Sequence, residues 1–452
     1  MKIQLNLTAL WILFITILLT NCKEPGPVNA YTPPSLDGTI DSILLNNLVH
    51  TWYPKAIDSV YGGYLSAFDS SFNAVGNQDK MIVSQARHLW NNSKAALHFP
   101  NDRPYRAFAH HGFQFLHDKM WDHIHGGFFQ LVNRAGAPKP DSNKTAYGNA
   151  FGLYAISAYY LMSHDSAALD LAKQSFLWLE QHSHDPKYKG YFQHLTYNGD
   201  IIQRDPTIPS TAETGYKDQN SSIHLLEAIT ELYKAWPDPL VKTRLLEMLY
   251  LIRDKEVNNK GNLVLFFTPD WKPVSFRDSS EECIKKHHNL DHVSFGHDIE
   301  TAYLLMEASE IAGLENDSVT NKKAKYMADQ TIRYGWDDKM DGFYDAGYYY
   351  KGADTITIIN KSKNWWTEAE GLNTLLILSK MYPKDPMNYY NLFLKQWKYI
   401  DRYLIDHKYG EWFDFGLDNN PEASSHLKGH IWKAGYHQYR ALENCVTNLR
   451  KN

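Results

Sequence analysis

A short pattern recurs six times along the chain and restricts the folds that it can adopt. Each copy has an acidic residue, a few polar residues, one or two glycines and then an aromatic residue, and the copies lie roughly 65 to 80 residues apart. Glycine supplies the positive φ of a tight turn, and the aromatic residue starts a short strand. The copies are DSVYGGY (58–64), DHIHGGFF (122–129), DPKYKGYF (185–192), DKMDGFYD (338–345), DHKYGEWFD (406–414) and a weaker DKEVNNKGNLVLFF (254–267).

Apolar residues with helical periodicity fill the intervals between the turns. One helix is predicted before each turn, over 40–57, 104–121, 165–182, 238–254, 319–335 and 386–405. A second helix is predicted after each turn, over 80–97, 145–163, 220–236, 297–312, 364–381 and 430–447. Twelve helices in six pairs predict an all-α domain over 39–450, an (α/α)6 barrel of six helical hairpins with short β-hairpin loops. An open solenoid is the alternative, but no obvious polar capping repeat is present, which favours closure.

The N-terminus predicts export. The first 22 residues read MKIQLNLTALWILFITILLTNC, with one Lys before a mainly apolar run. This is typical of a secretory signal, here over 1–21. The ending LLTNC resembles a bacterial lipobox, although Asn21 replaces the usual small residue, so we expect lipidation of Cys22. The Pro- and Gly-rich segment 22–38 then reads as a flexible tether. The prediction is an exported bacterial lipoprotein on the periplasmic or cell-surface face of a membrane; an uncleaved anchor would also attach it.

Composition narrows the class of partner. The net charge is only -5 and no basic patch is evident, so nucleic acid is not expected to bind. Aromatic residues make up 14% of the chain, with 13 Trp and 30 Tyr, which is common in proteins that bind carbohydrate but also fits a Tyr-rich core. Beyond Cys22, only Cys283 and Cys445 remain. Two cysteines make no disulfide framework, and their spacing does not suggest a metal site.

Unusual polar residues fall in the first half of each second helix. In a closed barrel these helices would form the inner ring, and their N-termini would bring these side chains and partial positive charge to one mouth. Any one of them alone is equally well explained as a satisfied core group. They are Arg87 in SQARHLW, Tyr147 and Asn149 in NKTAYGNAF, His224 in NSSIHLLEA, His297 and Glu300 in GHDIE, Trp366 and Glu370 in NWWTEAEG, and Trp432 and His437 in IWKAGYHQYRA.

Proton transfer is the chemistry that this set of residues favours. A lone HxxE without HExxH or CxxC does not predict a metal site, and a nucleophile elbow is missing. Glu300 and Glu370 keep glycoside hydrolysis open. Three histidines favour reversible proton transfer, because imidazole titrates near neutral pH. Two bases on opposite sides of one carbon could remove a proton and return it to the other face, with Arg87 stabilising the enolate oxygen.

Taken together and in order, these motifs resemble those of the N-acylglucosamine 2-epimerase superfamily, and more closely those of its cellobiose 2-epimerase (mannobiose 2-epimerase) branch. The resemblance covers about residues 40 to 448 and includes KTAYGNAF, IHLLEA, GHDIETAYLL, KNWWTEAEG, WKAGYHQYRA and the Gly–aromatic turns. It implies an (α/α)6 barrel that epimerises carbon 2 of the reducing-end sugar of a β-1,4-linked disaccharide without cofactor or metal. Cellobiose would become glucosyl-mannose, or mannobiose would become mannosyl-glucose. The lipobox departs from relatives that are commonly intracellular, which leaves the physiological substrate open.

The resemblance also implies roles for individual residues. It makes His297 and His437 the acid/base pair, and it makes His224 a polar contact that assists opening of the sugar ring. Glu300 would orient His297 and raise its basicity, or would hold a sugar hydroxyl. The other residues would surround the sugar: Arg87, Tyr147 and Asn149 on the reducing-end unit, Glu370 as a further substrate contact, and Trp366 and Trp432 stacked on sugar rings.

Three other functions stay open on the sequence alone. An N-acylglucosamine 2-epimerase or an aldose–ketose isomerase would share the enediolate step and would differ in whether the pocket accepts a second ring. A membrane-tethered glycan-binding protein would keep the aromatic residues but would not need both His297 and His437. A glycoside hydrolase would need two carboxyl groups across the scissile bond. The protein is expected to be a monomer.

Overall fold

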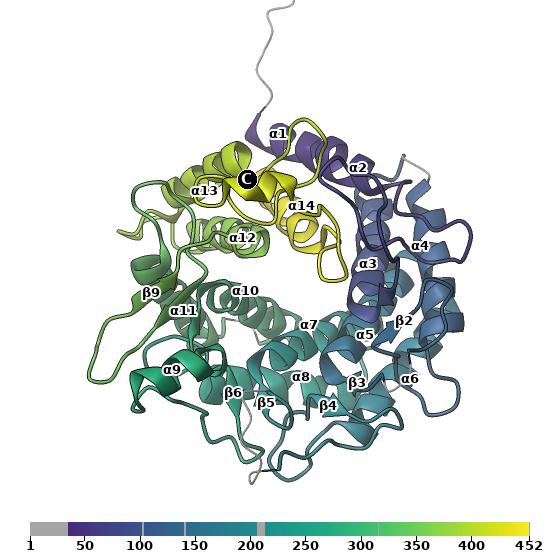
Figure 1. Cartoon of the computed structure of the whole chain (residues 1–452), viewed down its shortest axis with the longest axis horizontal. Coiled ribbons are helices and arrows are strands. Elements are labelled where there is room, and N and C mark those ends of the chain that lie inside the picture. Colours follow the sequence, from purple (N-terminus) through teal and green to yellow (C-terminus); the bar gives the residue numbers. More distant parts are fainter. Residues whose placement is uncertain (1–34, 102–103, 140–141, 206–212, 315, 452) are drawn as a thin grey trace, which may run out of the picture.

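The computed structural model describes residues 35–101, 104–139, 142–205, 213–314 and 316–451. The predicted signal segment, Cys22 and the tether up to residue 34 lie outside the described residues. The described chain forms two concentric rings of helices around a central opening (Figure 1). This confirms the predicted (α/α)6 barrel. Within the described residues, none of the helices has the length and apolar character needed to cross a membrane.

The outer and inner rings alternate along the chain. The outer segments are α1 (Leu36–Ser42) with η1 (Ile43–Val49) and α2 (His50–Trp52), α4 (Pro104–Phe115) with η2 (Leu116–Met120), α6 (Ser166–His182), α8 (Pro239–Leu251) with η3 (Ile252–Glu256), α11 (Ser318–Gly335) and α13 (Tyr389–Tyr403). The inner helices are α3 (Ile82–His98), α5 (Ala146–Ser163), α7 (Gln219–Ala235), α10 (Phe295–Ile311), α12 (Trp365–Met381) and α14 (Tyr436–Arg450). Each inner helix packs against the next, and α14 packs against α3, so the ring is closed.

The recurring Gly–aromatic turn shapes the contact between the two rings. The aromatic residue after the turn points at a glycine of an inner helix, as Phe128 does at Gly152 and Phe343 does at Gly371. A Cβ on Gly152 would lie 2.5 Å from the Phe128 ring, and a Cβ on Gly371 would lie 2.5 Å from the Phe343 ring. These glycines therefore serve close packing inside helices.

Short antiparallel strands join neighbouring hairpins at the end of the barrel where the inner helices begin. They are β1 (Lys80–Met81) with β2 (Leu131–Val132), β3 (Lys144–Thr145) with β4 (His194–Leu195), β5 (Lys217–Asp218) with β6 (Phe266–Phe267), and β7 (Val293–Ser294) with β8 (Ala346–Tyr348) and β9 (Thr357–Asn360). Within the turns, single bridges such as Ile57 to Tyr64 and Trp121 to Phe128 close the predicted β-hairpin loops.

Buried Lys–Asp pairs tie five of the six hairpins together. In each hairpin, the Lys lies just before the inner helix or before the loop that leads to this helix. Its ammonium group pairs with the Asp that begins the Gly turn. The same ammonium group donates a hydrogen bond to a backbone carbonyl of that turn. Such a pair is strongly destabilised if one partner is removed, because the other charge is left buried. The pairs are Lys80–Asp58 (3.0 Å), Lys144–Asp122 (2.7 Å), Lys217–Asp185 (2.7 Å), Lys363–Asp337 (2.9 Å) and Lys428–Asp406 (2.8 Å).

The fourth hairpin is the exception to this pairing. Asn258 accepts from the backbone N–H groups of its turn, as the Asp residues do elsewhere, but buried Val293 stands where the other hairpins have Lys. Both charges are replaced together, so neither is left unpaired. This hairpin also contains α9 (Glu281–His287) and η4 (His288–Leu290), which the sequence did not predict.

One inner helix begins later than predicted. The periodicity placed the last inner helix at 430–447, but α14 begins at Tyr436, directly after Gly435 with φ +70°. A residue with positive φ cannot lie within an α-helix, so the segment before it forms a loop. Trp432 therefore lies on this loop and not on the helix; the loop reaches over the central opening (Figure 1).

Candidate active site

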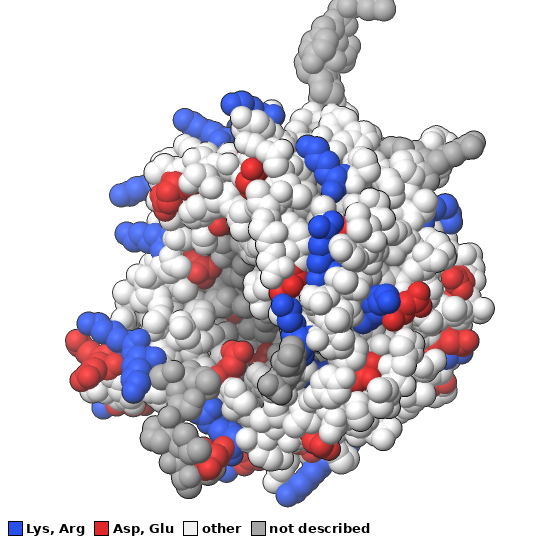
Figure 2. Space-filling view, turned by 45° about the vertical axis from the view of Figure 1, so that its right-hand side comes forward, with Lys and Arg blue, Asp and Glu red and all other residues white. Residues whose placement is uncertain are grey.

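A cavity of about 260 Å³ lies at the end of the barrel where the inner helices begin. Eight predicted residues line it, and Asn220 and Trp365 are additions that the sequence did not single out. On the face shown in Figure 2, acidic and basic side chains are interspersed, without a large area of one sign. The eight predicted lining residues are Arg87, Tyr147, His224, His297, Glu300, Trp366, Trp432 and His437.

His437 is fixed on both ring nitrogens. Its Nδ1 lies 2.7 Å from Glu370 Oε1, and its Nε2 lies 3.3 Å from Arg87 Nη2. Arg87 can only donate, so Nε2 is the unprotonated nitrogen and the Nδ1 proton points to Glu370. Burial, together with the positive charges of Arg87 and Arg440, lowers the pKa of His437 well below its ordinary value. The ring is therefore neutral, and its Nε2 lone pair accepts from Arg87, which lines the cavity beside it.

His297 has a different support. Its Nδ1 lies 2.8 Å from the Ser294 hydroxyl oxygen, and its ring centroid lies 4.8 Å from that of Trp366. The imidazole is surrounded by protein and partly exposed to the cavity, and this burial, with His224 and His292 nearby, lowers its pKa to about 3. His297 is thus also neutral at neutral pH.

The predicted pairing of Glu300 with His297 is wrong. Glu300 Oε1 accepts from Arg440 Nη2 at 2.5 Å and lies 3.8 Å from His437 Nδ1. A charge-assisted hydrogen bond to a buried guanidinium is stronger than one to a neutral imidazole, which explains the choice of partner. The predicted rise in the basicity of His297 is also wrong, because burial lowers its pKa.

His224 is backed by a carboxylate from one turn further along α7. Its Nδ1 lies 2.9 Å from Glu227 Oε2. Burial alone would raise the pKa of Glu227, but Arg440 and His224 lower it to about 2, so the group is ionised and accepts the Nδ1 proton. The sequence repeats this spacing in IHLLE and HDIE, so Glu227 could have been found from the pattern.

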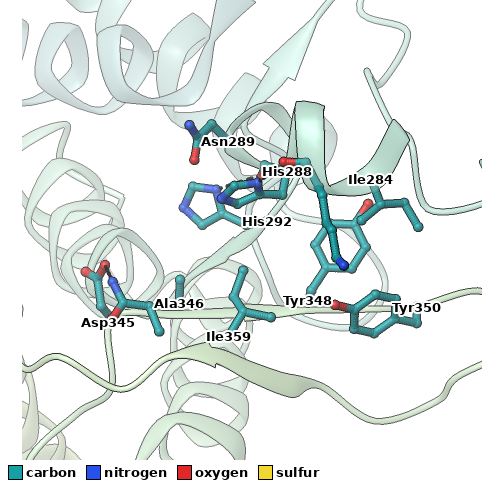
Figure 3. A pocket seen from close by; sticks show the side chains of 11 residues that line it. Ile284, His288, Asn289, His292, Asp345, Ala346, Tyr348, Tyr350 and Ile359 are labelled. Atoms are coloured by element: carbon teal, nitrogen blue, oxygen red, sulfur yellow. Dashed lines mark hydrogen bonds between the residues drawn. The ribbon is translucent and has the colours of Figure 1, made fainter. Parts of the chain in front are cut away.

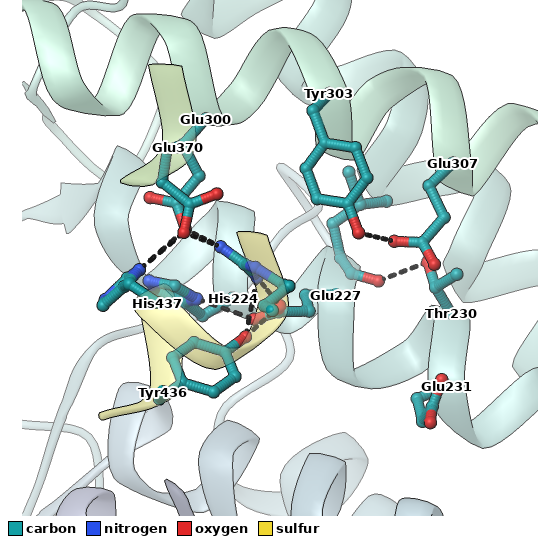
Figure 4. A network of polar contacts seen from close by, with 12 residues as sticks. His224, Glu227, Thr230, Glu231, Glu300, Tyr303, Glu307, Glu370, Tyr436 and His437 are labelled. Atoms are coloured by element: carbon teal, nitrogen blue, oxygen red, sulfur yellow. Dashed lines mark hydrogen bonds and ion pairs between the residues drawn. The ribbon is translucent and has the colours of Figure 1, made fainter. Parts of the chain in front are cut away.

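Arg440 on α14 is the centre of this network. Figure 4 shows the carboxyl groups of Glu227, Glu300 and Glu370, together with His224, Tyr436 and His437. The Arg440 guanidinium donates to Glu227, to Glu300 at 2.5 Å and to Glu370 at 2.6 Å, and it also contacts the Tyr436 hydroxyl at 2.6 Å. One buried cation thus meets three buried carboxyl groups. Sequence reasoning missed Arg440, because only the folded ring brings α7, α10 and α12 to the same side of α14.

The carboxyl cluster also bears on metal binding. Ligand-type atoms of Glu300, Glu370 and His437 all lie within 4.8 Å of one another. The Arg440 guanidinium, however, contacts the facing oxygens of both carboxyl groups and supplies the positive charge there.

Burial and the neighbouring Glu300 raise the pKa of Glu370 against the effect of Arg440. Glu370 and His437 therefore form a pair that can share one proton.

Two residues predicted to contact substrate lie elsewhere. Asn149 is buried in the wall, where its side chain accepts from Phe128 N at 2.7 Å and donates to Thr145 O at 2.8 Å. Glu370 lies behind His437 and is completely buried. Both amide atoms of Asn149 are used in holding the turn to α5, so it is a packing residue of the barrel.

Arg87 and Asn220 offer polar groups to a ligand. Arg87 donates to Trp432 O at 2.6 Å and lies 3.4 Å from the Tyr147 hydroxyl, so it also holds the loop before α14 in place. Among the described residues, the buried Asn220 Oδ1 has no hydrogen-bond partner. Asn220 is also one of the lining residues, and an unpartnered acceptor beside a cavity is suited to a hydroxyl donor from a ligand. The Trp432 side chain is 46% exposed at the mouth of the cavity, and its ring can contact a part of a ligand that extends out of the cavity.

Comparison with known proteins identifies the family. A profile described as N-acylglucosamine 2-epimerase (GlcNAc 2-epimerase) matches residues 63–441. The chain belongs to the N-acylglucosamine 2-epimerase family.

A cellobiose 2-epimerase from Bacteroides fragilis is 27% identical, over 88% of this chain and 95% of the relative. A D-mannose isomerase from Marinomonas mediterranea is 26% identical, over 88% and 94%. The crystal structure of a cellobiose 2-epimerase from Spirochaeta thermophila superposes with a TM-score of 0.77 at 26% identity, over 91% of this chain and 96% of that one. This membership makes the protein a carbohydrate epimerase or isomerase.

Proposed function

We propose that this enzyme epimerises carbon 2 of the reducing-end sugar of a disaccharide, with His297 and His437 as the two bases. The supporting observation is that both imidazoles are neutral and flank the same indole: Trp366 lies 4.8 Å from His297 and 5.8 Å from His437 between ring centroids. A sugar ring or open chain beside Trp366 is then within reach of a base from α10 and a base from α14. General acid–base groups act best when positioned in this way.

The reaction needs an open-chain sugar, because only a carbonyl at carbon 1 acidifies the proton on carbon 2. His224, backed by Glu227, is placed to move the proton between the ring oxygen and O1 during opening. One of the two bases then removes the carbon-2 proton, and Arg87 stabilises the negative charge that develops on O1. The other histidine, protonated by solvent before this step, delivers that proton from its imidazolium to the opposite face, and the first histidine afterwards releases the proton that it removed to solvent. One proton leaves and one arrives, so the product is the epimer.

The preference for a disaccharide rests on two supports. The relatives named cellobiose 2-epimerase align over nearly their whole length, and the exposed Trp432 at the mouth offers a face for a second ring. The second candidate is aldose–ketose isomerisation, which the D-mannose isomerase relative favours. The two reactions share the enediolate and differ in whether the returning proton goes to carbon 2 or to carbon 1.

The test is to incubate the purified protein with cellobiose, mannobiose, mannose and N-acetylglucosamine and to identify the products by NMR. We expect conversion of a disaccharide to its carbon-2 epimer, with faster turnover than for either monosaccharide. Formation of a ketose from mannose as the main reaction would assign the second candidate. Release of monosaccharides from the disaccharides would instead assign a hydrolase.

We also propose that Cys22 carries a lipid and that the mouth faces away from the membrane. The outer segment that starts at Leu36 runs toward the first Gly turn, which lies at the mouth end, so Leu36 lies at the opposite end. Arg450 near the C-terminus bonds Asp37 and Asp41, which places both described termini together there. Replacement Cys22→Ser should move the enzyme from the membrane fraction to the soluble fraction. An unchanged distribution, with no lipid mass on Cys22, would refute the anchor.

A further inference from the structure

The fourth hairpin carries a feature that the other hairpins do not share among the described residues. Between β6 and β7, residues 268–292 form a long connection that contains α9 and η4 and lies over the β7–β8–β9 sheet. Asp291 fixes this connection, because its Oδ2 accepts from Phe276 N at 2.5 Å and from the Tyr348 hydroxyl at 2.9 Å. A cavity of about 360 Å³ remains between the connection and the sheet (Figure 3). That volume falls in the range of roughly 300–1,000 Å³ that small-ligand pockets have.

The polar lining of this cavity can both donate and accept hydrogen bonds. His288 Nδ1 contacts Lys285 O at 2.9 Å, and His292 Nδ1 contacts His288 O at 3.1 Å. A carbonyl only accepts, so both Nδ1 atoms carry the proton and both Nε2 atoms are left as acceptors. The Asn289 amide adds a donor and an acceptor, and Tyr350, which is 39% exposed, adds a ring face and a hydroxyl at the open side.

The charge of the lining indicates a neutral ligand. Among the described residues that line the cavity, Lys285 is the one Lys or Arg, and Asp345 is the one Asp or Glu. Burial raises the pKa of Asp345, although amides from Asn360 and Asn364 oppose this rise, and burial lowers the pKa of His292. A phosphate or sulfate would meet only one cation, and a purely apolar molecule would leave the imidazoles and amides unpaired. A ring with several hydroxyls and apolar C–H faces matches both the polar groups and the tyrosine.

The cavity is built on the same strands as the catalytic side of the barrel. Ala346 lines it and pairs directly with Ser294, whose hydroxyl holds His297. Asp345 accepts from Asn364 Nδ2 at 2.5 Å, and Asn364 caps α12 immediately before the two tryptophans that line the central cavity. His292 lies close enough to His297 to contribute to the lowering of its pKa. The second cavity therefore adjoins the part of the barrel wall that positions His297 and the two tryptophans.

We infer that the cavity between α9 and the β8–β9 hairpin binds a pyranose unit of a longer substrate chain, beyond the part of that chain that the central cavity holds. This inference rests on the proposed function. Binding at this cavity would give the enzyme a preference for neutral tri- and tetrasaccharides over disaccharides. The fourth hairpin would determine this preference.

The test compares chain lengths in matched variants. The cavity variants are Tyr350→Ala and His288→Ala, and the control is Tyr390→Ala, a tyrosine of similar exposure (46%) on outer helix α13. In the wild type we expect kcat/KM for the tri- and tetrasaccharides of the accepted sugar to exceed that for the disaccharide. Each cavity variant should lower kcat/KM for the longer chains by about 3- to 10-fold through KM, as loss of a hydrogen bond or stacking contact predicts. The disaccharide values and the control should stay unchanged.

A second measurement separates this inference from the proposed function. A trisaccharide reduced to its alditol has no carbonyl and cannot react, so its binding can be followed by calorimetry whether or not the enzyme epimerises anything. Weaker alditol binding in Tyr350→Ala than in Tyr390→Ala supports the site. Equal binding in both variants, or equal kcat/KM for all chain lengths in the wild type and the cavity variants, overturns it. An inactive wild type that still binds the alditol through Tyr350 would overturn the proposed function alone.

Discussion

The two sides of the central cavity hold their histidines in different ways. On the side of α12 and α14, His437 Nδ1 lies 2.7 Å from Glu370 Oε1, and Arg440 contacts the same oxygen at 2.6 Å. On the side of α10, His297 Nδ1 lies 2.8 Å from Ser294 Oγ. A carboxyl group can take up a proton and can stabilise an imidazolium, whereas an aliphatic hydroxyl gives only a neutral hydrogen bond. The two proposed bases are therefore not equivalent.

This difference has a consequence for the direction of proton transfer. When His437 accepts a proton on Nε2, its Nδ1 proton can shift toward Glu370, whose pKa is raised by burial and by Glu300. Within the described part of the chain, His297 Nδ1 contacts the Ser294 hydroxyl and has no carboxyl group behind it, so its cation must be stabilised by the substrate or by the reaction intermediate. We therefore expect the epimer whose proton faces His437 to exchange that proton with solvent faster than the other epimer does.

The largest effect should follow from removing either base. His297→Asn and His437→Asn should each lower turnover by roughly 10²- to 10⁴-fold, the range for a general acid–base group. Each variant should still exchange the carbon-2 proton of one epimer, because the remaining base can act on its own face. The measurement is deuterium uptake by NMR from both epimers, with circular dichroism to confirm folding. Near-wild-type turnover in either folded variant would refute the two-base assignment.

Arg440 tests the charged side of the cavity alone. Arg440→Met leaves three buried carboxyl groups without their cation, and it should reduce the free energy of unfolding by about 3–5 kcal/mol, as loss of one partner from a buried ion cluster does. The matched control is Arg450→Met, whose half-exposed pairs with Asp37 and Asp41 should contribute about 0–1 kcal/mol. Chemical denaturation measures both. A similar, small effect for the two variants would show that Arg440 does not hold the cluster together.

Replacing the residue that contacts Nδ1 of each histidine, Glu370 for His437 and Ser294 for His297, compares the two sides of the cavity directly. Once His437 has become an imidazolium, its hydrogen bond to Glu370 is charge-assisted and contributes about 1.5–3 kcal/mol, so Glu370→Gln should lower kcat by roughly 10- to 100-fold. Ser294→Ala removes a neutral hydrogen bond of about 0.5–1.5 kcal/mol, so kcat should fall by roughly 2- to 10-fold. Steady-state kinetics on both epimers checks this order. An equal loss in the two variants would mean that the supports only orient the rings and that the charge of Glu370 plays no part.

The sequence was sufficient for the barrel and for the position of most cavity residues. The Gly–aromatic turns set the hairpins, and an inner helix that starts after each turn must bring its first residues to the mouth. His224, His297 and His437 follow from that geometry, since each lies in the first turns of an inner helix. The buried Lys–Asp pairs were also readable in principle, because Lys80, Lys144 and Lys428 each follow their Asp by 22 residues.

The partners of the histidines could not be predicted from local spacing. Glu300 lies three residues after His297, yet its carboxyl group turns to Arg440, because the strength of a contact across the ring outweighs proximity along one helix. Asn149 has the same helical position as other cavity residues, but the backbone of the preceding turn uses its amide. Trp432 is placed by Gly435, whose positive φ ends the helical register. Such outcomes depend on neighbouring helices that the one-dimensional pattern does not specify.

The smallest effect concerns stability against pH, and it has opposite signs on the two sides. The pKa of His297 is lowered to about 3 in the folded state, from an ordinary 6.5, so the unfolded chain binds the extra proton between these values. Stability should therefore fall as pH falls from about 6.5 to 3, and His297→Asn should flatten this decline.

The pKa of Glu370 is raised in the folded state. The contribution of Glu370 to the free energy of unfolding is therefore present at low pH and is lost as pH rises through the pKa that Glu370 has in the folded protein. Glu370→Gln should thus gain stability relative to the wild type as pH rises from about 4.5 to about 8. Thermal unfolding from pH 3 to 9 covers both windows and measures both slopes, and equal slopes in the two variants would mean that the two sides do not differ in charge.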